Sequence, residues 1–267
     1  MKASKFDLLN IKPEDRKVVL LQSGGLDSCY LACLLNYYGF EIHHIFIDYG
    51  QNSKDKEWDS ALNIVKTYGG TIQRVTLDMP WLKESDILNG GIAVSRPDLE
   101  REMGAVKSGV YVPMRNMLFL SIASSYAEAH EIMYIATGVD GFQDRDGKPL
   151  GGTPDKHPNF VLKLEEALRE SSVMHHMKHK DFEILCPIIG FEKVNTISQG
   201  IGIDCDFTNS WSCYNATDKP CLSCDTCLSR AYAFDFLGYE DPTLVKYYGH
   251  YDSLEDLIKK VTNPIDI

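Results

Sequence analysis

The sequence lacks any apolar run that approaches the roughly 18–20 residues needed to cross a bilayer, and its Lys-rich start has no secretory hydrophobic segment. We therefore expect a cytoplasmic protein with no membrane contact. Positive charge is also scarce, because 27 Lys and Arg stand against 38 Asp and Glu, a formal net charge of −11. Without surplus cations to displace counterions, broad binding to nucleic acid phosphates is not expected. Small molecules or proteins are the expected partners.

Apolar runs alternate with helical patterns over residues 17–200. Predicted strands cover 17–22, 41–48, 71–77, 132–137 and 182–186, and predicted helices cover 26–38, 55–68, 117–130, 158–172 and 193–200. This βαβ spacing predicts an α/β fold with a doubly wound, five-stranded parallel sheet. Leu62 and Leu118 are expected on the apolar stripes of their helices.

Two long segments interrupt the alternation. Residues 78–110 contain scattered Pro and Gly and are too long for an ordinary connection, so they form either a lid or partner-binding insertion or a disordered surface loop. Residues 141–157 form a second long loop, rich in Gly and Asp. We expect residues 1–204 to form one domain that carries both insertions, followed by a C-terminal segment, 205–267.

The stretch at 18–28, VVLLQSGGLDS, is an apolar strand broken by a glycine pair and followed at once by helical pattern. Gly24 and Gly25 allow a sharp turn and let backbone N–H groups approach an anion closely. The helix that begins near Leu26 points the positive end of its dipole into the same space. The stretch therefore predicts a phosphate cradle, with a purely structural turn as the alternative.

Three polar side chains complete this cradle. Ser23 and Ser28 add hydroxyl groups, and Asp27 takes a position suited to Mg²⁺. The pattern is not the Walker loop GxxxxGK[ST], because its spacing is shorter and no Lys follows.

Half of the eight cysteines crowd into one segment, as Cys213, Cys221, Cys224 and Cys227. In a cytoplasmic chain such a cluster indicates a metal site rather than disulfides. Four thiolates can enclose one tetrahedral ion, so a structural Zn²⁺ is expected, with an iron–sulfur cluster as the alternative.

Two other groups carry weaker signals. Cys29 and Cys33 lie one helical turn apart without nearby partners and are interpreted as small core residues. His175, His176 and His179 lack a matching thiol or carboxylate nearby, so a solvated or structural role is favoured over metal binding.

Taken together, the motifs resemble the QueC family of 7-cyano-7-deazaguanine synthases, which are PP-loop ATP pyrophosphatases. The resemblance runs from Lys17 to Pro242. The matching motifs are SGGLDS at 23–28, DYGQ at 48–51, YVPMRN at 111–116, Pro154-Asp155, Lys193, and WSCYN at 211–215 with its Cys tail. The resemblance implies the strand order 3-2-1-4-5, in which the loops at Ser23 and Gly138 face one another.

The resemblance also implies a reaction. ATP adenylates 7-carboxy-7-deazaguanine with release of pyrophosphate, and ammonia displaces AMP to give an amide. A second adenylation and elimination then give the nitrile. ATP and Mg²⁺ are the implied cofactors, with Zn²⁺ at the cysteines.

Roles for individual residues follow from the same resemblance. The implied catalytic residues are Ser23, Asp27, Ser28, Arg115 and Lys193. The implied ATP-binding residues are Ser23, Gly24, Gly25, Leu26, Asp27, Ser28, Asp48, Tyr49, Gln51, Arg115, Gly138 and Lys193. The implied substrate-binding residues are Asn116, Asp140, Pro154 and Asp155; the carboxylates of Asp140 and Asp155 suit the N–H edge of a guanine-like base.

The acceptor side departs from the family pattern. Residues 153–157 read TPDKH where the family usually has YPDCR, and Met114 stands where Gly or Ala is common. A second hypothesis is therefore a QueC-like enzyme of anti-phage defence that conjugates the activated deazaguanine to an amine of a partner protein. A binding module with a dead nucleotide site is the third, and the retained motif residues disfavour it. A homodimer is one assembly we consider.

Overall fold

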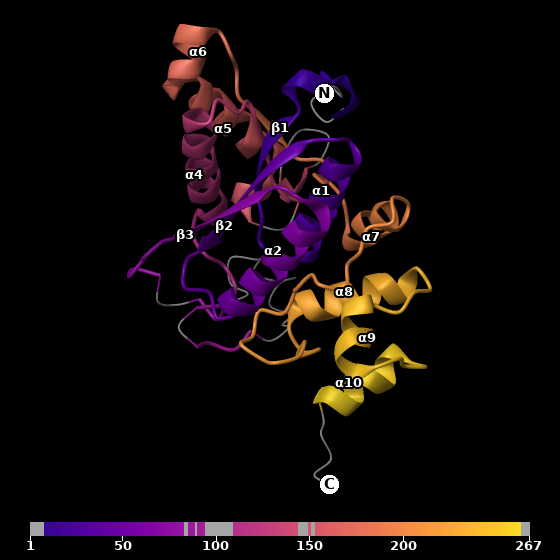
Figure 1. Ribbon diagram of the computed structural model, residues 1–267. Helices are drawn as coiled ribbons and strands as arrows, with labels where there is room; N and C mark the ends of the chain where they lie inside the picture. The colour runs from indigo at the N-terminus through magenta and orange to yellow at the C-terminus, as the bar shows by residue number, and fades with distance from the viewer. Residues whose placement is uncertain are drawn as a thin grey trace.

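The computed structural model describes residues 8–82, 85–88, 90–93, 109–143, 149–150 and 153–262. A five-stranded sheet lies at its centre, and every neighbouring pair of strands is parallel (Figure 1). In spatial order its strands are β3 (Thr71–Thr76), β2 (Glu41–Asp48), β1 (Lys17–Leu21), β4 (Tyr134–Ala136) and β7 (Glu183–Leu185). This is the order 3-2-1-4-5 among the five strands, so the predicted sheet is confirmed.

Helices connect the strands and continue beyond the last one. They are α1 (Leu26–Tyr37), α2 (Lys54–Tyr68), α4 (Arg115–Ala129), α5 (Pro158–Ser171), α6 (Val173–Lys178), α7 (Lys193–Ile201), α8 (Asp225–Phe236), α9 (Pro242–Tyr248) and α10 (Leu254–Thr262). Short 3₁₀ turns occupy η2 (Leu8–Asn10), η3 (Pro13–Asp15) and η5 (Pro154–Lys156). No described helix is long and apolar enough to cross a membrane.

The two faces of the sheet are both covered by helices. Val18 and Leu20 of β1 pack in one apolar cluster with α1 and α7, whereas Val19, between them, packs in a second cluster with α4 and α5. This alternation places a separate core on each side of the sheet, as a doubly wound fold requires.

The predicted buried stripes on two helices are wrong at one position each. Leu62 on α2 and Leu118 on α4 are 40% and 39% exposed. Smaller residues face inward instead, such as Ala61 on α2 and Ala123 on α4, both fully buried. A helix that presents small side chains can approach its neighbours closely, and α2 does so: a Cβ at Gly24 would lie 3.1 Å from Ser60 Cβ.

A third apolar cluster joins the C-terminal helices to the described part of the 78–110 segment. It contains Ile87, Leu88 and Ala93 together with Trp211 and Leu244. Ala93 is also tied to this region by two hydrogen bonds with the Asn215 side chain, at 2.8 and 3.0 Å. Thus the described part of the first insertion and the 205–267 segment share one core.

The second insertion, 141–157, is more regular than the expected loop. Its described part forms a small antiparallel hairpin, β5 (Phe142–Gln143) with β6 (Pro149–Leu150), followed by η5. Residues 144–148 and 151–152 of this insertion lie outside the described residues, as do residues 83–84, 89 and 94–108 of the first insertion. The prediction of a lid, a partner-binding insertion or a disordered loop over 78–110 therefore stays a prediction.

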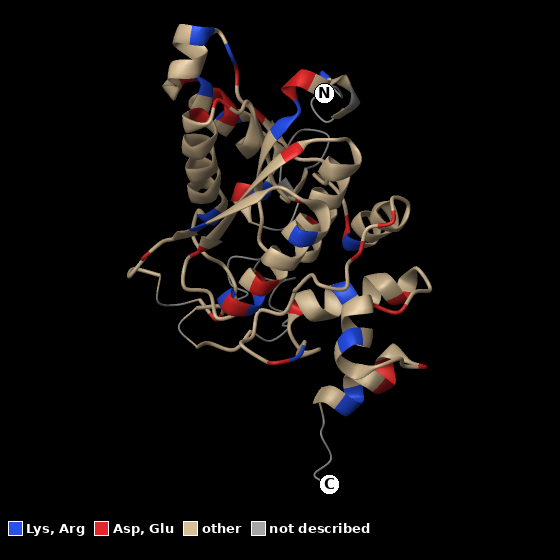
Figure 2. Cartoon of the chain, in the orientation of Figure 1, with Lys and Arg blue, Asp and Glu red and all other residues tan. Residues whose placement is uncertain are grey.

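Charged residues of both signs are interspersed over the described chain (Figure 2). On α10, for example, Glu255 and Asp256 precede Lys259 and Lys260.

Candidate functional site

The switch point of the sheet lies between β1 and β4, where the chain leaves the two strands toward opposite faces. The loops that follow these strands meet there: a Cβ at Gly138 would lie 3.2 Å from Asp27 Cβ. The prediction that the loops at Ser23 and Gly138 face one another is therefore confirmed. A pocket opens at this point, at the carboxyl edge of the sheet.

The glycine-containing loop after β1 forms the floor of the pocket. Ser23 Oγ and Ser28 Oγ lie 3.1 Å apart, and Ser23 Oγ accepts a hydrogen bond from Gly25 N at 3.3 Å. Gly25 is the N-cap of α1 and has no side chain to bind the first amide groups of the helix. These groups and the helix dipole therefore make the pocket attractive to an anion.

Gly24 is the one loop position that its surroundings restrict to glycine. Its φ is +73°, and a Cβ there would lie 2.2 Å from Glu57 O on α2. Gly24 N donates to Gln22 Oε1 at 3.0 Å, and Gly24 O accepts from Trp211 N at 2.8 Å. The loop is thus fixed from the sheet, from α2 and from the C-terminal segment.

Two ion pairs stand at the β4 side of this floor. Lys193, at the start of α7, is paired with Asp27 Oδ2. Lys156 Nζ donates to Asp140 Oδ1 at 3.0 Å. Asp27 Oδ1 is buried without a hydrogen-bond partner among the described residues.

Arg115 begins α4 and forms part of the opposite wall. Its Nη1 donates to the Tyr49 hydroxyl at 3.0 Å, and its guanidinium lies 5.8 Å from the centre of the Tyr49 ring. Burial lowers the pKa of Arg115, but Tyr49, Tyr214 and Asp155 raise it by more, so the pKa lies above its usual value. Arg115 is therefore a permanently charged group inside the pocket.

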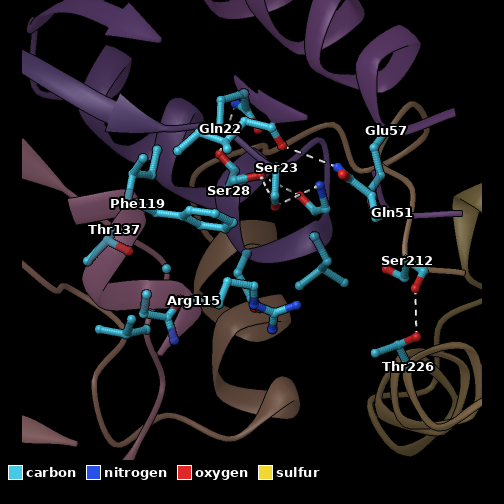
Figure 3. A pocket seen from close by; sticks show the side chains of 18 of the residues that line it. Gln22, Ser23, Ser28, Gln51, Glu57, Arg115, Phe119, Thr137, Ser212 and Thr226 are labelled. Atoms are coloured by element: carbon cyan, nitrogen blue, oxygen red, sulfur yellow. Dashed lines mark hydrogen bonds between the residues drawn. The ribbon is translucent and has the colours of Figure 1, made fainter. Parts of the chain in front are cut away.

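Side chains from α2, from α4 and from the connection between β2 and α2 complete the pocket. Ser23 and Ser28 lie between Phe119 on one side and Gln51 with Glu57 on the other (Figure 3). Gln51 Nε2 donates to Glu57 Oε2 at 2.8 Å. Burial raises the pKa of the Glu57 carboxyl, opposed by its hydrogen bonds.

The pocket gathers most of the predicted ligand-binding side chains. It is lined by Ser23, Gly25, Leu26, Asp27, Ser28, Tyr49, Gln51, Arg115, Asn116, Gly138 and Lys193.

Four of the predicted binding residues do not line the pocket: Gly24, Asp48, Pro154 and Asp155. Asp140 does not line it either, but it is paired with Lys156, which does. Gly24 lies on the side of the loop that packs against α2, and Pro154 begins the 3₁₀ turn η5, which ends at the pocket residue Lys156. Asp48 accepts from Arg74 at 2.7 Å and from Gly50 N at 3.1 Å, and does not line the pocket. Asp155 is 8% exposed, and its Oδ2 accepts from Asn116 N at 2.9 Å, so it caps the start of α4.

Several lining residues were not assigned from the sequence. Some come from the strands and their ends, namely Leu21, Ile45, Ile47, Thr137 and Val139; the others are Gln22, Glu57, Phe119, Lys156, Trp211, Ser212, Tyr214 and Thr226. The last four come from the C-terminal segment, where Thr226 Oγ1 donates to Ser212 O at 2.6 Å (Figure 3). The WSCYN motif and the altered TPDKH run were visible signals, but nothing in them indicates which side chains face the pocket.

The four clustered cysteines lie next to this wall. Their sulfur atoms all lie within 4.8 Å of one another, and Cys221 Sγ and Cys227 Sγ are 4.0 Å apart. Sulfurs around tetrahedral zinc are about 3.8 Å apart, since each Zn–S bond is about 2.3 Å. The amide groups Asn215 Nδ2 and Cys224 N both point at Cys221 Sγ, at 3.4 Å, as suits a thiolate. The cluster fits a metal ion of zinc's size and chemistry.

The cysteine pair on α1 is part of the core, as predicted. Cys29 and Cys33 are buried against α7 and its following turn, where Cys29 Sγ donates to Asp206 O at 3.4 Å. The premise that the histidines have no carboxylate nearby is wrong, because His175 Nδ1 lies 2.6 Å from Asp181 Oδ1. This contact and that of His176 with Glu170 O, at 2.9 Å, lie at the surface.

Comparison with known proteins places these features in a family. A family model described as "Queuosine biosynthesis protein QueC" matches residues 17–238. A 7-cyano-7-deazaguanine synthase of Thermoplasma acidophilum is 32% identical over 247 residues, covering 92% of this chain and 98% of the relative. A 7-cyano-7-deazaguanine synthase of Clostridium kluyveri is 32% identical over 238 residues, covering 88% of this chain and 99% of the relative. Among solved structures, NMN synthetase from Francisella tularensis aligns with a TM-score of 0.39 at 14% identity, covering 94% of this chain and 84% of that one.

Proposed function

The chain belongs to the QueC family of queuosine biosynthesis proteins, and from this membership we propose that it is an ATP-dependent 7-cyano-7-deazaguanine synthase. Its substrate is 7-carboxy-7-deazaguanine. One round of adenylation and attack by ammonia gives the 7-amide, and a second adenylation with elimination gives the nitrile. AMP and pyrophosphate leave in each round.

One observation carries the proposal: the pocket at the switch point combines an anion-binding loop with three cations. Ser23, Ser28 and the amide groups at the start of α1 face the pocket, together with Arg115, Lys156 and Lys193. A site with this composition suits the transfer of a nucleotidyl group, in which catalysis consists mainly of positioning and charge stabilisation.

The order of the strands divides the pocket into two halves. Tyr49 and Gln51 follow β2, on one side of the loop, and form the nucleoside half. Asp140 follows β4, on the other side, and η5 contributes Lys156 there. This second half receives the acid, so that its carboxylate meets the α-phosphate between the halves.

The charged residues then have distinct tasks. The loop from Ser23 to Ser28 binds the leaving pyrophosphate, and Lys193 neutralises the charge near it. Arg115 stabilises the negative charge that develops at the α-phosphate as the carboxylate attacks. No protein nucleophile is required, because the substrate's own oxygen attacks phosphorus. Asp155 contributes by holding the amino end of α4, and with it Arg115.

Both metals are part of the proposal. The unpartnered, buried Asp27 Oδ1 fits Mg²⁺, which when bound would offset the negative charge of the phosphates. The four thiolates of Cys213, Cys221, Cys224 and Cys227 fit Zn²⁺ as a closed structural site, and the bound ion would hold in place the segment that brings Ser212, Tyr214 and Thr226 to the pocket.

The test is mass spectrometry of a reaction that contains the purified protein, ATP, Mg²⁺, 7-carboxy-7-deazaguanine and ammonia. We expect AMP, pyrophosphate and the nitrile, and loss of all three in Lys193→Met. AMP without nitrile, together with a deazaguanine-sized mass shift on an added protein encoded by a neighbouring gene, would show conjugation instead. No AMP with any acceptor would refute adenylation.

A further inference from the structure

Lys156 is a cation of the pocket that belongs to the altered TPDKH run. Its backbone is pressed against the end of the β4 loop: a Cβ at Gly141 would lie 2.2 Å from Lys156 O. Only a glycine at 141 permits this approach, and Asp140, the preceding residue, is thereby brought to Lys156. The close passage of the two segments thus builds the 3.0 Å pair between Lys156 Nζ and Asp140 Oδ1.

The pair leaves Lys156 with donors to spare. An ammonium group has three N–H donors, and among the described residues the one acceptor recorded for Lys156 Nζ is Asp140. The Lys156 side chain lines the pocket and is 32% exposed, so its remaining donors can reach a bound molecule.

The other cations of the pocket already have tasks in the nucleotide half or at the loop. Arg115 donates to Tyr49, which belongs to the nucleoside half, and Lys193 is paired with Asp27 of the phosphate loop. Both lysines stand at the β4 side, where the acid is received, but Lys193 is held by Asp27 of the phosphate loop, whereas Lys156 is held by Asp140, which follows β4. Among the described pocket residues it is therefore the cation best placed for an anionic group of the acceptor.

We propose that Lys156 binds the carboxylate of the acid that is adenylated, and that Asp140 is the positioning residue that holds its ammonium group toward that carboxylate. This inference rests on the proposed function and deepens it, because it names the group that selects an acid. The ammonium would lower the repulsion between the incoming carboxylate and the phosphates of ATP.

The charge state of the pair supports this role. Burial and the Arg115 charge lower the pKa of Lys156, but Asp140 and Tyr214 together raise it by more, so the pKa of the ammonium lies above its usual value. Burial raises the pKa of Asp140, and Lys156 and Lys193 lower it by more. Both groups are therefore ionised at neutral pH.

The two-step reaction provides a control within the enzyme itself. The first adenylation acts on a carboxylate, whereas the second acts on a neutral amide. A cation that recognises the carboxylate matters for the first substrate and little for the second. A lysine that instead bound ATP or only supported the fold would affect both steps alike.

The experiment measures kcat and KM for 7-carboxy-7-deazaguanine, for the 7-amide and for ATP, in the wild type and in Lys156→Met. We expect KM for the acid to rise about 10- to 100-fold, the effect of losing one charge-assisted hydrogen bond. KM for the amide and for ATP should change less than about threefold. Lys156→Arg should recover most of the acid affinity, and Lys163→Met, at an exposed lysine on the next helix, should have no effect.

Each other outcome contradicts the inference. Equal losses for acid and amide, or a raised KM for ATP alone, would assign Lys156 to the nucleotide or to the fold. An unchanged KM for the acid would show that Lys156 does not bind the carboxylate. Lys156→Gln replaces Lys156→Met if thermal unfolding shows that the latter does not fold. Wild-type protein that forms no AMP with the acid would refute the proposed function itself, before any variant is compared.

Discussion

Acidification should loosen the phosphate loop through one buried histidine, His44 of β2. His44 is 1% exposed, and its Nε2 lies 3.1 Å from Gly69 O. A carbonyl oxygen can only accept, so Nε2 carries the proton and Nδ1 accepts from Gln22 Nε2 at 3.5 Å. Gln22 in turn accepts from Gly24 N in the loop. A second proton, on Nδ1, would place two donors face to face.

The size of the effect follows from the pKa of His44. Burial lowers this pKa from 6.5 to about 4. The unfolded chain therefore takes up the proton first as the pH falls. The stability contributed by neutral His44 is complete above about pH 6.5, is lost as the pH falls from there to about 4, and changes no further below. The difference between the two pKa values corresponds to about 3 kcal/mol of unfolding free energy in total. About 2.5 kcal/mol of this is lost between pH 7.5 and pH 4.5.

The assay is urea unfolding at pH 7.5, 5.5 and 4.5, with wild type compared to His44→Gln. Carboxylates such as Asp48 and Asp140, whose pKa values are lowered in the fold, lose stability on acidification in both proteins and cancel. We expect the wild type to lose about 2 to 3 kcal/mol more than the variant. His176→Gln, at an exposed histidine, should behave as the wild type does. Equal pH dependence in wild type and His44→Gln would refute the reasoning.

Three further predictions concern the loop, the C-terminal core and the metal. Gly24→Ala should abolish ATP binding in calorimetry, because its Cβ would lie 2.2 Å from a carbonyl oxygen of α2. The control is Gly39→Ala, where φ is +75° and nothing lies within 4 Å of the added Cβ; it should cost only about 1 kcal/mol of stability. Retained ATP affinity in Gly24→Ala would contradict the prediction. Arg230→Met should lower the free energy of unfolding by about 3–5 kcal/mol, because it leaves the buried Asp241 carboxylate, now bonded at 2.7 and 2.9 Å, without its counter-ion. A loss below about 1 kcal/mol would show that the pair is dispensable. Cys224→Ser should lose zinc by elemental analysis, and chelation should lower the Tm of the wild type; full zinc content in the variant would exclude Cys224 as a ligand.

The sequence predicted the sheet because strand patterns and helix patterns alternate along it at βαβ spacing, with an almost wholly apolar run at β1. β2 was predicted with the bounds it has, Glu41–Asp48, and the metal cluster needed only the spacing of four cysteines. Both features depend on residues that lie close together in the sequence, so they can be predicted without knowing how distant segments pack. The position of the phosphate loop followed from the same strand–glycine–helix pattern.

Contacts between distant segments could not be predicted. Leu62 looked like a core residue because its helix is amphipathic, yet α2 turns its smaller side chains toward the phosphate loop. The sequence did not predict that Asp155 caps α4, because its hydrogen bond from Asn116 N depends on how η5 docks against that helix; the role of Asp155 in substrate binding stays a prediction. Lys156 went unassigned for the same reason.

The hydrogen bond from Trp211 N to Gly24 O has a consequence for the order in which the protein is made. A ribosome synthesises the phosphate loop early, but Trp211 and the pocket residues Ser212, Tyr214 and Thr226 emerge only after all five strands of the sheet. The nascent chain can therefore complete its sheet while one wall of the nucleotide pocket is still missing. That wall is added by the same segment that gathers the four cysteines, so the enzyme's site is completed only after its sheet.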